Sequence, residues 1–285
     1  MTLEKLLLSQ DKRGISKIKD SLPENFCYDA ATFVLDNPGK VIITTGFYIL
    51  SAGKAETDGP PGAVAIGNAL KNLGFEVVYI TDIYCTEILK AITLDESKII
   101  EFPIANRAES EHAARKILQN EKPDLLISIE RCSPASDGLY RNMRDLDITK
   151  HTAKIDLLFD KHTTSIGIGD GGNEIGLGNL YAEVDASEEL VGFPAKTKVE
   201  KLIISSVSNW GGYGLVPALS AIKGENLLPS VEEDSENIRK IVAAGAVDGF
   251  RGKTLIEWTA SPWRKMPFSC KAYTIWSKAP NSSQT

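Results

Sequence analysis

The sequence has few of the residues that build thiol and histidine sites. It holds four cysteines in 285 residues, far apart and without a C-x-x-C pair, and only three histidines. These counts argue against a disulfide framework or a zinc–thiolate site, and they are typical of a protein in a reducing compartment. No G-x-S-x-G motif is present either, so nothing supports a serine hydrolase of the α/β type.

Long apolar runs and basic runs are also missing. The N-terminal apolar run is only three leucines, too short for a secretory signal, and no segment approaches the ~20 apolar residues of a membrane span. The net charge is −6, and no cluster of lysine and arginine marks a nucleic-acid surface. We therefore expect a cytoplasmic protein that binds neither nucleic acid nor membrane and is free to form a homo-oligomer.

Short apolar segments recur along the chain and predict β-strands. They are rich in Val and Ile, and most do not alternate with polar residues, which is typical of strands buried on both faces. Helical spacing at 62–74 and 107–121 lies between them. This alternation predicts an α/β fold with a largely parallel or mixed sheet flanked by helices, forming one catalytic domain over 1–255, with two lobes as the alternative. The predicted strands are 41–46, 77–82, 99–104, 125–130, 165–170 and 201–207.

Several predicted strands end in side chains that can do chemistry. Thr44 and Thr45, Asp82, Glu130 and Asp170 all stand at such ends. Loops are generally polar, so any one of these ends has an ordinary explanation. Four ends together, each followed by a loop with Gly or Pro, indicate a site at the carboxyl ends of the strands, where open α/β sheets bind ligands.

A glycine-rich stretch, SIGIGDGGNEIGLGN at 165–179, is the most distinctive loop. It contains G-x-G-x-x-G after a strand, the dinucleotide-binding pattern. Asp170 and Glu174, however, would put two anionic side chains beside a pyrophosphate. A hard divalent cation such as Mg²⁺ or Mn²⁺ prefers such oxygen ligands. We interpret the loop as a metal or polar-substrate site and expect no nucleotide cofactor; a structural turn remains the alternative.

Two further loops carry clustered polar groups. In 47–70, Glu56 and Asp58 precede a Gly-Pro-Pro-Gly turn and a helix. A role in capping or turn formation explains Asp58 well and Glu56 poorly. The glycine-rich segment 208–214 is expected to be another loop after a strand. Trp210 and Tyr213 in this segment are candidates for the walls of a pocket.

The third loop, 129–148, offers a binding group for a carboxylate. Tyr140, Asn142 and Arg144 supply a hydroxyl, an amide and a guanidinium close together. The guanidinium fork matches the two oxygens of a substrate carboxylate. The alternative is a surface arginine paired with Asp145 or Asp147.

These loops, in this order, resemble the D-glutamate cyclase-like C-terminal domain family. The matching stretches between residues 41 and 249 are TTGF, ETDGPPGA, IER…DGLYRNMR, GDGGNEIGLGN and AVDG. The resemblance implies an α/β protein, and the best-described activity of the family is dehydration of D-glutamate to 5-oxo-D-proline, a lyase reaction. The motif residues carried over are Glu56, Asp58, Glu130, Asp137, Asn142, Arg144, Asp170, Asn173, Glu174 and Asp248.

That reaction asks for groups of this kind. A carboxylate is a poor electrophile, so a Lewis acid or a strong hydrogen-bond donor must draw charge from it, and one protein carboxylate must move the ammonium proton to the departing oxygen. A divalent ion would also let an anionic substrate enter an acidic pocket. We assign catalysis to Asp170, Glu174 and Glu130, and metal binding to Glu130, Asp137, Asp170, Glu174 and Asp248. Substrate binding is assigned to Thr44, Thr45, Glu56, Asp58, Tyr140, Asn142, Arg144, Gly171, Gly172 and Asn173.

Two other functions fit the same residues. An acidic cavity that holds two cations could serve a metal-dependent phosphatase or related hydrolase. A domain that binds a small ligand without turnover is the other.

The end of the chain differs in character from the rest. Residues 256–285 hold three of the four tryptophans, with four basic residues and one acidic residue and no helical or strand period. We expect this tail to be a frameshift product, because another reading frame permits an acidic amphipathic ending that contains Val-Asp-Gly. A divergent terminus is the alternative.

Overall fold

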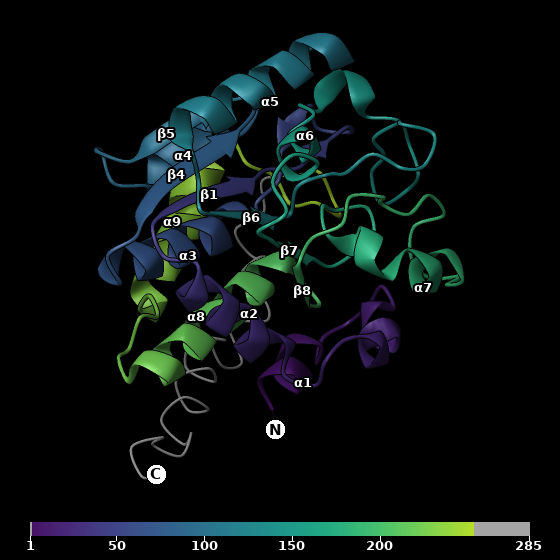
Figure 1. Ribbon diagram of the computed structural model, residues 1–285. Helices are drawn as coiled ribbons and strands as arrows, with labels where there is room; N and C mark the ends of the chain where they lie inside the picture. Colours follow the sequence, from purple (N-terminus) through teal and green to yellow (C-terminus); the bar gives the residue numbers. More distant parts are fainter. Residues whose placement is uncertain (1, 254–285) are drawn as a thin grey trace.

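A six-stranded sheet forms the centre of the structure, a computed structural model that describes residues 2–253 (Figure 1). Its order is β5-β4-β1-β6-β7-β8, and all neighbouring strands are parallel. The predicted α/β fold with a largely parallel sheet is confirmed, and each strand overlaps a predicted segment. The strands are β1 (Lys40–Thr45), β4 (Glu76–Thr81), β5 (Lys98–Glu101), β6 (Leu125–Ile129), β7 (Ser165–Gly169) and β8 (Lys201–Ile204).

The strand order is that of a doubly wound sheet. Counted along the chain, the six strands lie in the spatial order 3-2-1-4-5-6. The winding therefore reverses between β1 and β6, and a crevice opens at such a switch point beyond the carboxyl ends of the two strands. The loops after β1, β6 and β7 all start at this edge.

The absence of alternation in the strands follows from burial on both faces. In β1, Val41 and Ile43 pack into the larger core, whereas Ile42 points to the opposite face and a second core. Every residue of β6 and β7 is buried. Continuous apolar strands of this kind need helices on each side, and the chain supplies them.

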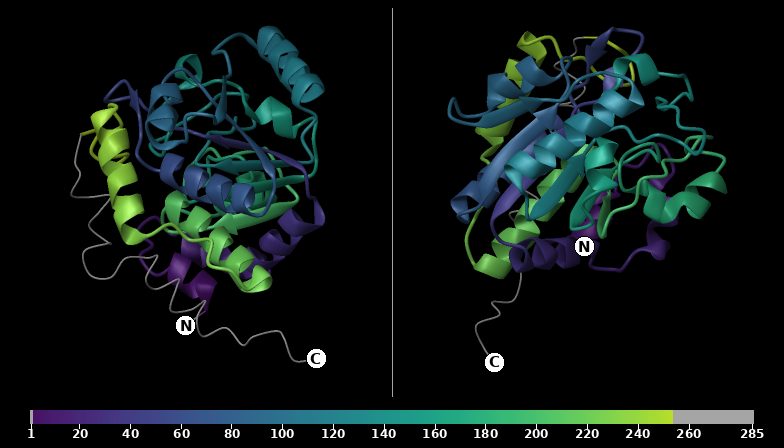
Figure 2. Two further views of the ribbon diagram at one scale, coloured as in Figure 1. Left: turned by 90° about the vertical axis from the view of Figure 1, so that its left-hand side faces the viewer. Right: turned by 45° about the horizontal axis from the view of Figure 1, so that its top comes forward.

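Helices cover both faces of the sheet (Figure 2). The larger core lies under α1, α2, α3, α4, α8 and α9, and the second core lies under α5 and α6. A small hairpin, β2 (Tyr48–Ile49) with β3 (Lys54–Ala55), follows β1. The helices are α1 (Leu3–Leu7), α2 (Phe26–Asp36), α3 (Pro60–Asn72), α4 (Thr86–Ile92), α5 (Arg107–Glu121), α6 (Asp156–Phe159), α7 (Tyr181–Asp185), α8 (Ser208–Lys223) and α9 (Val231–Ala243), with 3-10 turns η1 (Ile15–Ser21), η2 (Thr149–His151) and η3 (Leu177–Leu180).

The expectation of a glycine-rich loop at 208–214 is wrong, because this segment is the first half of α8. Its glycines serve helix packing instead of a turn. A Cβ at Gly212 would lie 3.0 Å from the Cα of Gly62 in α3, and one at Gly62 would lie 3.1 Å from the Cα of Asn209. The two helices therefore approach closely where neither has a side chain.

Three other expectations concern the cysteines, a membrane span and the end of the chain. Cys27, Cys85 and Cys132 are buried free thiols. Within residues 2–253, no helix has the length and apolar character needed to cross a membrane. The predicted boundary at 255 and the tail 256–285 lie outside the described residues.

Candidate active site

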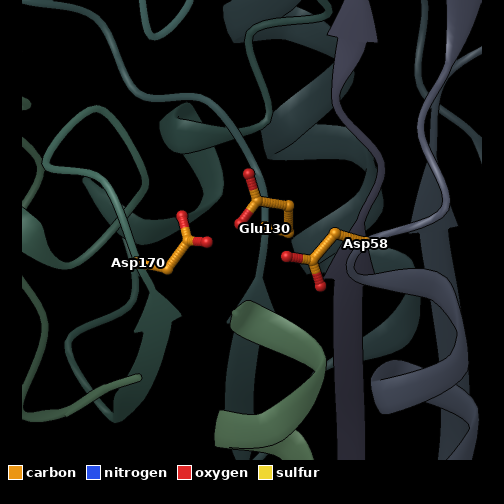
Figure 3. A group of neighbouring side chains, drawn as sticks. All are labelled: Asp58, Glu130 and Asp170. Carbon is orange, nitrogen blue, oxygen red and sulfur yellow. The ribbon is translucent and has the colours of Figure 1, made fainter. Parts of the chain in front are cut away.

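Carboxylates from three loops converge at the carboxyl ends of β1, β6 and β7. Glu56 and Asp58 follow the hairpin after β1, Glu130 comes directly after β6, and Asp170 directly after β7. Figure 3 shows Asp58, Glu130 and Asp170 pointing toward one another, and one carboxylate oxygen of each lies within 4.8 Å of the others. We call these four residues the acidic cluster. It lies at the switch point of the sheet.

Glu130 is held in an unusual backbone conformation. Its φ is +46°, a left-handed value that costs a residue with a side chain roughly 1–3 kcal/mol. The side chain is 5% exposed, and its Oε2 accepts a short hydrogen bond from the hydroxyl of Ser208. Gly59 leaves room for it, because a Cβ there would lie 2.8 Å from the Glu130 Cβ.

Asp58 is fixed by hydrogen bonds at the N-termini of α3 and α8, where a side chain before or in each helix caps the other. Its carboxylate accepts the backbone N–H groups of Ser208 (2.9 Å) and Asn209 (2.7 Å), in the first turn of α8. In return, Oδ1 of Asn209 accepts the N–H groups of Gly59 (3.0 Å) and Gly62 (2.9 Å) at the start of α3. Asp58 therefore does cap a helix, but that helix is α8. The positive ends of two helix dipoles face the acidic cluster.

Asp170 is paired with an arginine from the N-terminal segment. Arg13 Nη1 lies 2.7 Å from Asp170 Oδ1. Sequence reasoning missed Arg13, because it lies in a polar stretch before any strand. The only local sign was Asp11 three residues before Gly14: the Asp11 carboxylate accepts the N–H groups of Arg13, Gly14 and Ser16 and so fixes the turn.

Glu174 closes the glycine-rich loop on itself. It is fully buried, and its two carboxylate oxygens accept the N–H groups of Asp170 (3.2 Å), Gly171 (2.8 Å) and Gly172 (2.8 Å). Gly172 has φ +107°, which only glycine adopts without strain. The N–H groups that a phosphate would need are therefore already bound to a side chain.

Burial and crowding change the acidity of the cluster. Burial, followed by repulsion from neighbouring carboxylates, raises the pKa of Glu56 and of Glu130 well above the usual range. Burial also raises the pKa of Asp170, against the attraction of Arg13, and that of Asp58 to about 6, against its backbone hydrogen bonds. Raised pKa values of this kind, produced by burial together with neighbouring charges, are typical of functional sites.

Two cavities adjoin the cluster and share part of their walls. The first measures about 170 Å³ and the second about 110 Å³. Both are lined by Arg13, Glu56, Glu130, Met143 and Gly249. The first adds Asn142, Arg144 and Asn173 among its polar walls. The second adds Asp58, Asp170, Asp248, Trp210 and Tyr213, together with the apolar Val207, Ile238 and Phe250.

Some of the predicted site residues serve other contacts. Asn173 lines the first cavity and donates through Nδ2 to the Arg141 carbonyl (2.9 Å), whereas Arg144 is exposed at the rim and donates to the Phe250 carbonyl (3.3 Å). Asp248 lines the second cavity, and its Oδ1 accepts the N–H groups of Phe250 (3.1 Å) and Arg251 (2.8 Å).

Others line neither cavity. Asp137 is on the surface, paired with Arg141 at 2.5 Å. The Tyr140 hydroxyl donates to Asp156 at 2.5 Å, and its ring packs in a small separate apolar cluster with Cys132 and Ile148. Thr44 and Thr45 are fully buried in β1 and line neither cavity.

Comparison with known proteins decides the family. The sequence model described as D-glutamate cyclase-like, C-terminal, matches residues 3–258. The chain belongs to this family. It is also 34% identical over 238 residues to the human protein named D-glutamate cyclase, mitochondrial, a match that covers 77% of this chain and 38% of the human protein. The chain therefore spans well under half the length of that curated relative.

Proposed function

We propose that this member of the D-glutamate cyclase-like family is a lyase that converts D-glutamate into 5-oxo-D-proline and water. The observation that carries the proposal is the approach of Asp58, Glu130 and Asp170 within 4.8 Å at the switch point. The name of the human relative supplies the substrate class. Buried carboxylates repel one another, so a site that crowds them needs a ligand or a reaction that uses the crowding.

We further propose that Asp58, Glu130 and Asp170 hold Mg²⁺ or Mn²⁺. The donor set suits a hard cation, because every candidate ligand is a carboxylate oxygen. The balance of charge supports the same conclusion, since Arg13 is the single basic residue in the described lining of the second cavity, which contains all four carboxylates of the cluster. When bound, such an ion would polarise the γ-carboxyl group of the substrate as a Lewis acid.

Glu130 is the best-placed carrier of protons. Its Oε2 accepts a hydrogen bond from the neutral hydroxyl of Ser208, whereas Asp170 is paired with the Arg13 guanidinium at 2.7 Å. Glu130 also lines both cavities. It would take a proton from the substrate ammonium and return it to the departing oxygen. Glu174 was a candidate for this step, but backbone N–H groups occupy its oxygens, so we assign it to positioning of the loop.

The first cavity offers the groups for the rest of the substrate. Arg144 at its rim would bind the α-carboxylate, and Asn142 and Asn173 stand beside it. In this orientation the α-carboxylate of the substrate would lie toward solvent and the reacting γ-carboxyl group toward the acidic cluster.

The test is direct. The purified chain is incubated with D-glutamate and Mg²⁺ or Mn²⁺, and 5-oxoproline is measured by chromatography before and after treatment with EDTA. We expect EDTA to abolish product formation and the metal to restore it. Glu130→Gln should lower kcat about 100-fold or more, whereas the matched surface variant Asp137→Asn should retain activity, because that side chain lies outside both cavities.

The outcomes separate the proposal from its alternatives. Turnover that survives complete removal of metal would end the metal assignment and leave the lyase. No 5-oxoproline, with phosphate released from a panel of phosphoesters, would favour a metal-dependent phosphatase. A thermal shift with D-glutamate and no product from any substrate would favour a binding domain.

A further inference from the structure

Arg13 has hydrogen-bonding capacity that its own protein does not use. Its side chain is 17% exposed, it lines both cavities, and Nη1 donates to Asp170. Within residues 2–253, its other N–H groups form no hydrogen bond. Arg131 provides the contrast: it is 1% exposed and binds the Asp82 carboxylate and two backbone carbonyls, as a structural arginine does.

The guanidinium of Arg13 is held firmly in place. The Asp11 carboxylate fixes the turn that carries it, and the N–H of Gln10 donates to the Ser206 hydroxyl, just after β8. The opposite wall is the backbone of Gly171, where a Cβ would lie 1.7 Å from Arg13 Nη2. The absence of a side chain at 171 therefore makes room for this guanidinium.

The proposed reaction creates negative charge close to this group. The amine nitrogen forms a bond to Cδ, and an electron pair of the γ-carboxyl group moves onto oxygen. One oxygen then leaves as water with two of the three ammonium protons, the third proton stays on the lactam nitrogen, and the C–O bond breaks. Glu56, Glu130 and Asp170 would repel this oxyanion, so a fixed positive charge on the protein beside it would add to the stabilisation that the proposed cation supplies.

Resting on the proposed cyclisation, we propose that Arg13 is a catalytic residue that donates to the oxyanion formed at the γ-carboxyl carbon. Its spare donors face the cavities that the substrate enters, and its position is set before the substrate arrives. Preorganised donors of this kind stabilise a transition state more than a ground state. Arg144, exposed at the rim, has the different task of holding the α-carboxylate throughout.

The two arginines can be separated with a tetrahedral analogue. In the D-isomer of 2-amino-4-phosphonobutyrate, a tetrahedral phosphorus replaces the trigonal Cδ of D-glutamate. Binding of this phosphonate and of D-glutamate is measured by calorimetry on wild type, Arg13→Ala and Arg144→Ala. We expect Arg13→Ala to weaken the phosphonate about 100-fold and D-glutamate less than about fivefold. Arg144→Ala should weaken both ligands equally.

Turnover gives a second reading. Arg13→Ala should lower kcat about 100-fold with little change in KM, and Arg13→Lys should recover part of the loss because it restores the charge. Gly171→Ala should reproduce the selective loss of phosphonate binding, since its methyl group displaces the guanidinium. Lys17→Ala, an exposed change further along the same segment, is the control for the segment's stability.

Each result decides the matter. Equal weakening of both ligands by Arg13→Ala, or no weakening of either, would overturn the role of Arg13. If wild type forms no 5-oxoproline but Arg13→Ala selectively loses the phosphonate, the cyclase function fails while Arg13 remains a receptor for a tetrahedral anion. Product formation by wild type with unchanged phosphonate binding in both Arg13→Ala and Gly171→Ala would leave the function standing and remove Arg13 from it.

Discussion

The buried carboxylates of this protein fall into two kinds, and the difference marks the site. On the far face of the sheet, Asp156 accepts one hydrogen bond from the hydroxyl of Tyr140, and in α9 Asp234 accepts one from that of Tyr213. In each case the side-chain donor is a neutral tyrosine hydroxyl. In the acidic cluster, by contrast, several carboxylates face one another around Arg13. Burial raises pKa values in both regions, so crowding, and not burial, distinguishes the candidate active site.

Asp170→Asn should break this contrast most strongly. Asparagine keeps an oxygen for Arg13 but removes a negative charge from the proposed cation site. We expect kcat/KM for 5-oxoproline formation to fall by about two to four orders of magnitude. The melting temperature should change little, because repulsion within the cluster decreases as the ion pair is lost. A variant that keeps more than about a tenth of wild-type kcat/KM would show that the crowding has no catalytic use.

Glu174→Gln tests the acidic residue of the glycine-rich loop whose side chain accepts hydrogen bonds from the backbone. Its carboxylate oxygens accept three backbone N–H groups. In glutamine, an NH₂ group would replace one of these oxygens and could not accept a hydrogen bond from the backbone N–H groups. We expect a loss of about 3 kcal/mol in the free energy of unfolding, measured with urea. Glu225→Gln, at an exposed position after the end of α8, would serve as the matched surface change. Unchanged stability with full loss of activity would instead return Glu174 to the catalytic groups.

The fold was predictable from the sequence because doubly buried strands leave a strong signal. Six Val- and Ile-rich segments, each within a few residues of an observed strand, gave the parallel sheet. The convergence of Asp58, Glu130 and Asp170 also followed, since parallel strands end at the same edge. The order of the strands did not follow, and it is the order that brings the loops after β1 and β6 together at the switch point.

Contacts between distant segments were beyond sequence reasoning. Arg13 reaches Asp170 across 157 positions of the chain, and no local pattern announces such a pair. Glycines were read as loops at 208–214, whereas they let α8 pack against α3. Within the glycine-rich loop, the types of the acidic residues were informative, but only coordinates show that Glu174 turns inward to backbone N–H groups while Asp170 faces the cluster.

Asp156, a buried carboxylate outside the acidic cluster, allows the comparison to be tested through the pH dependence of stability. Burial raises the pKa of Asp156 to about 6 from an ordinary 3.8, so between those pH values the folded protein holds a proton that the unfolded chain has released. Raising the pH through this window removes that proton from the folded state and lowers the free energy of unfolding.

Asn at position 156 cannot titrate and still offers an oxygen to Tyr140. The stability of wild type minus that of Asp156→Asn should therefore fall from pH 4 to pH 6, by at most ~1.4 kcal/mol per pH unit, and then stay level. Urea unfolding at several pH values measures it, with kcat followed in parallel. If the difference in free energy of unfolding between the two proteins stayed constant across this range, the pKa of Asp156 would not be raised by burial. A raised pKa would then distinguish the acidic cluster from the buried carboxylates outside it. Activity should be unaffected by the change, because Asp156 lines neither cavity and is the first residue of α6, which packs on the second core.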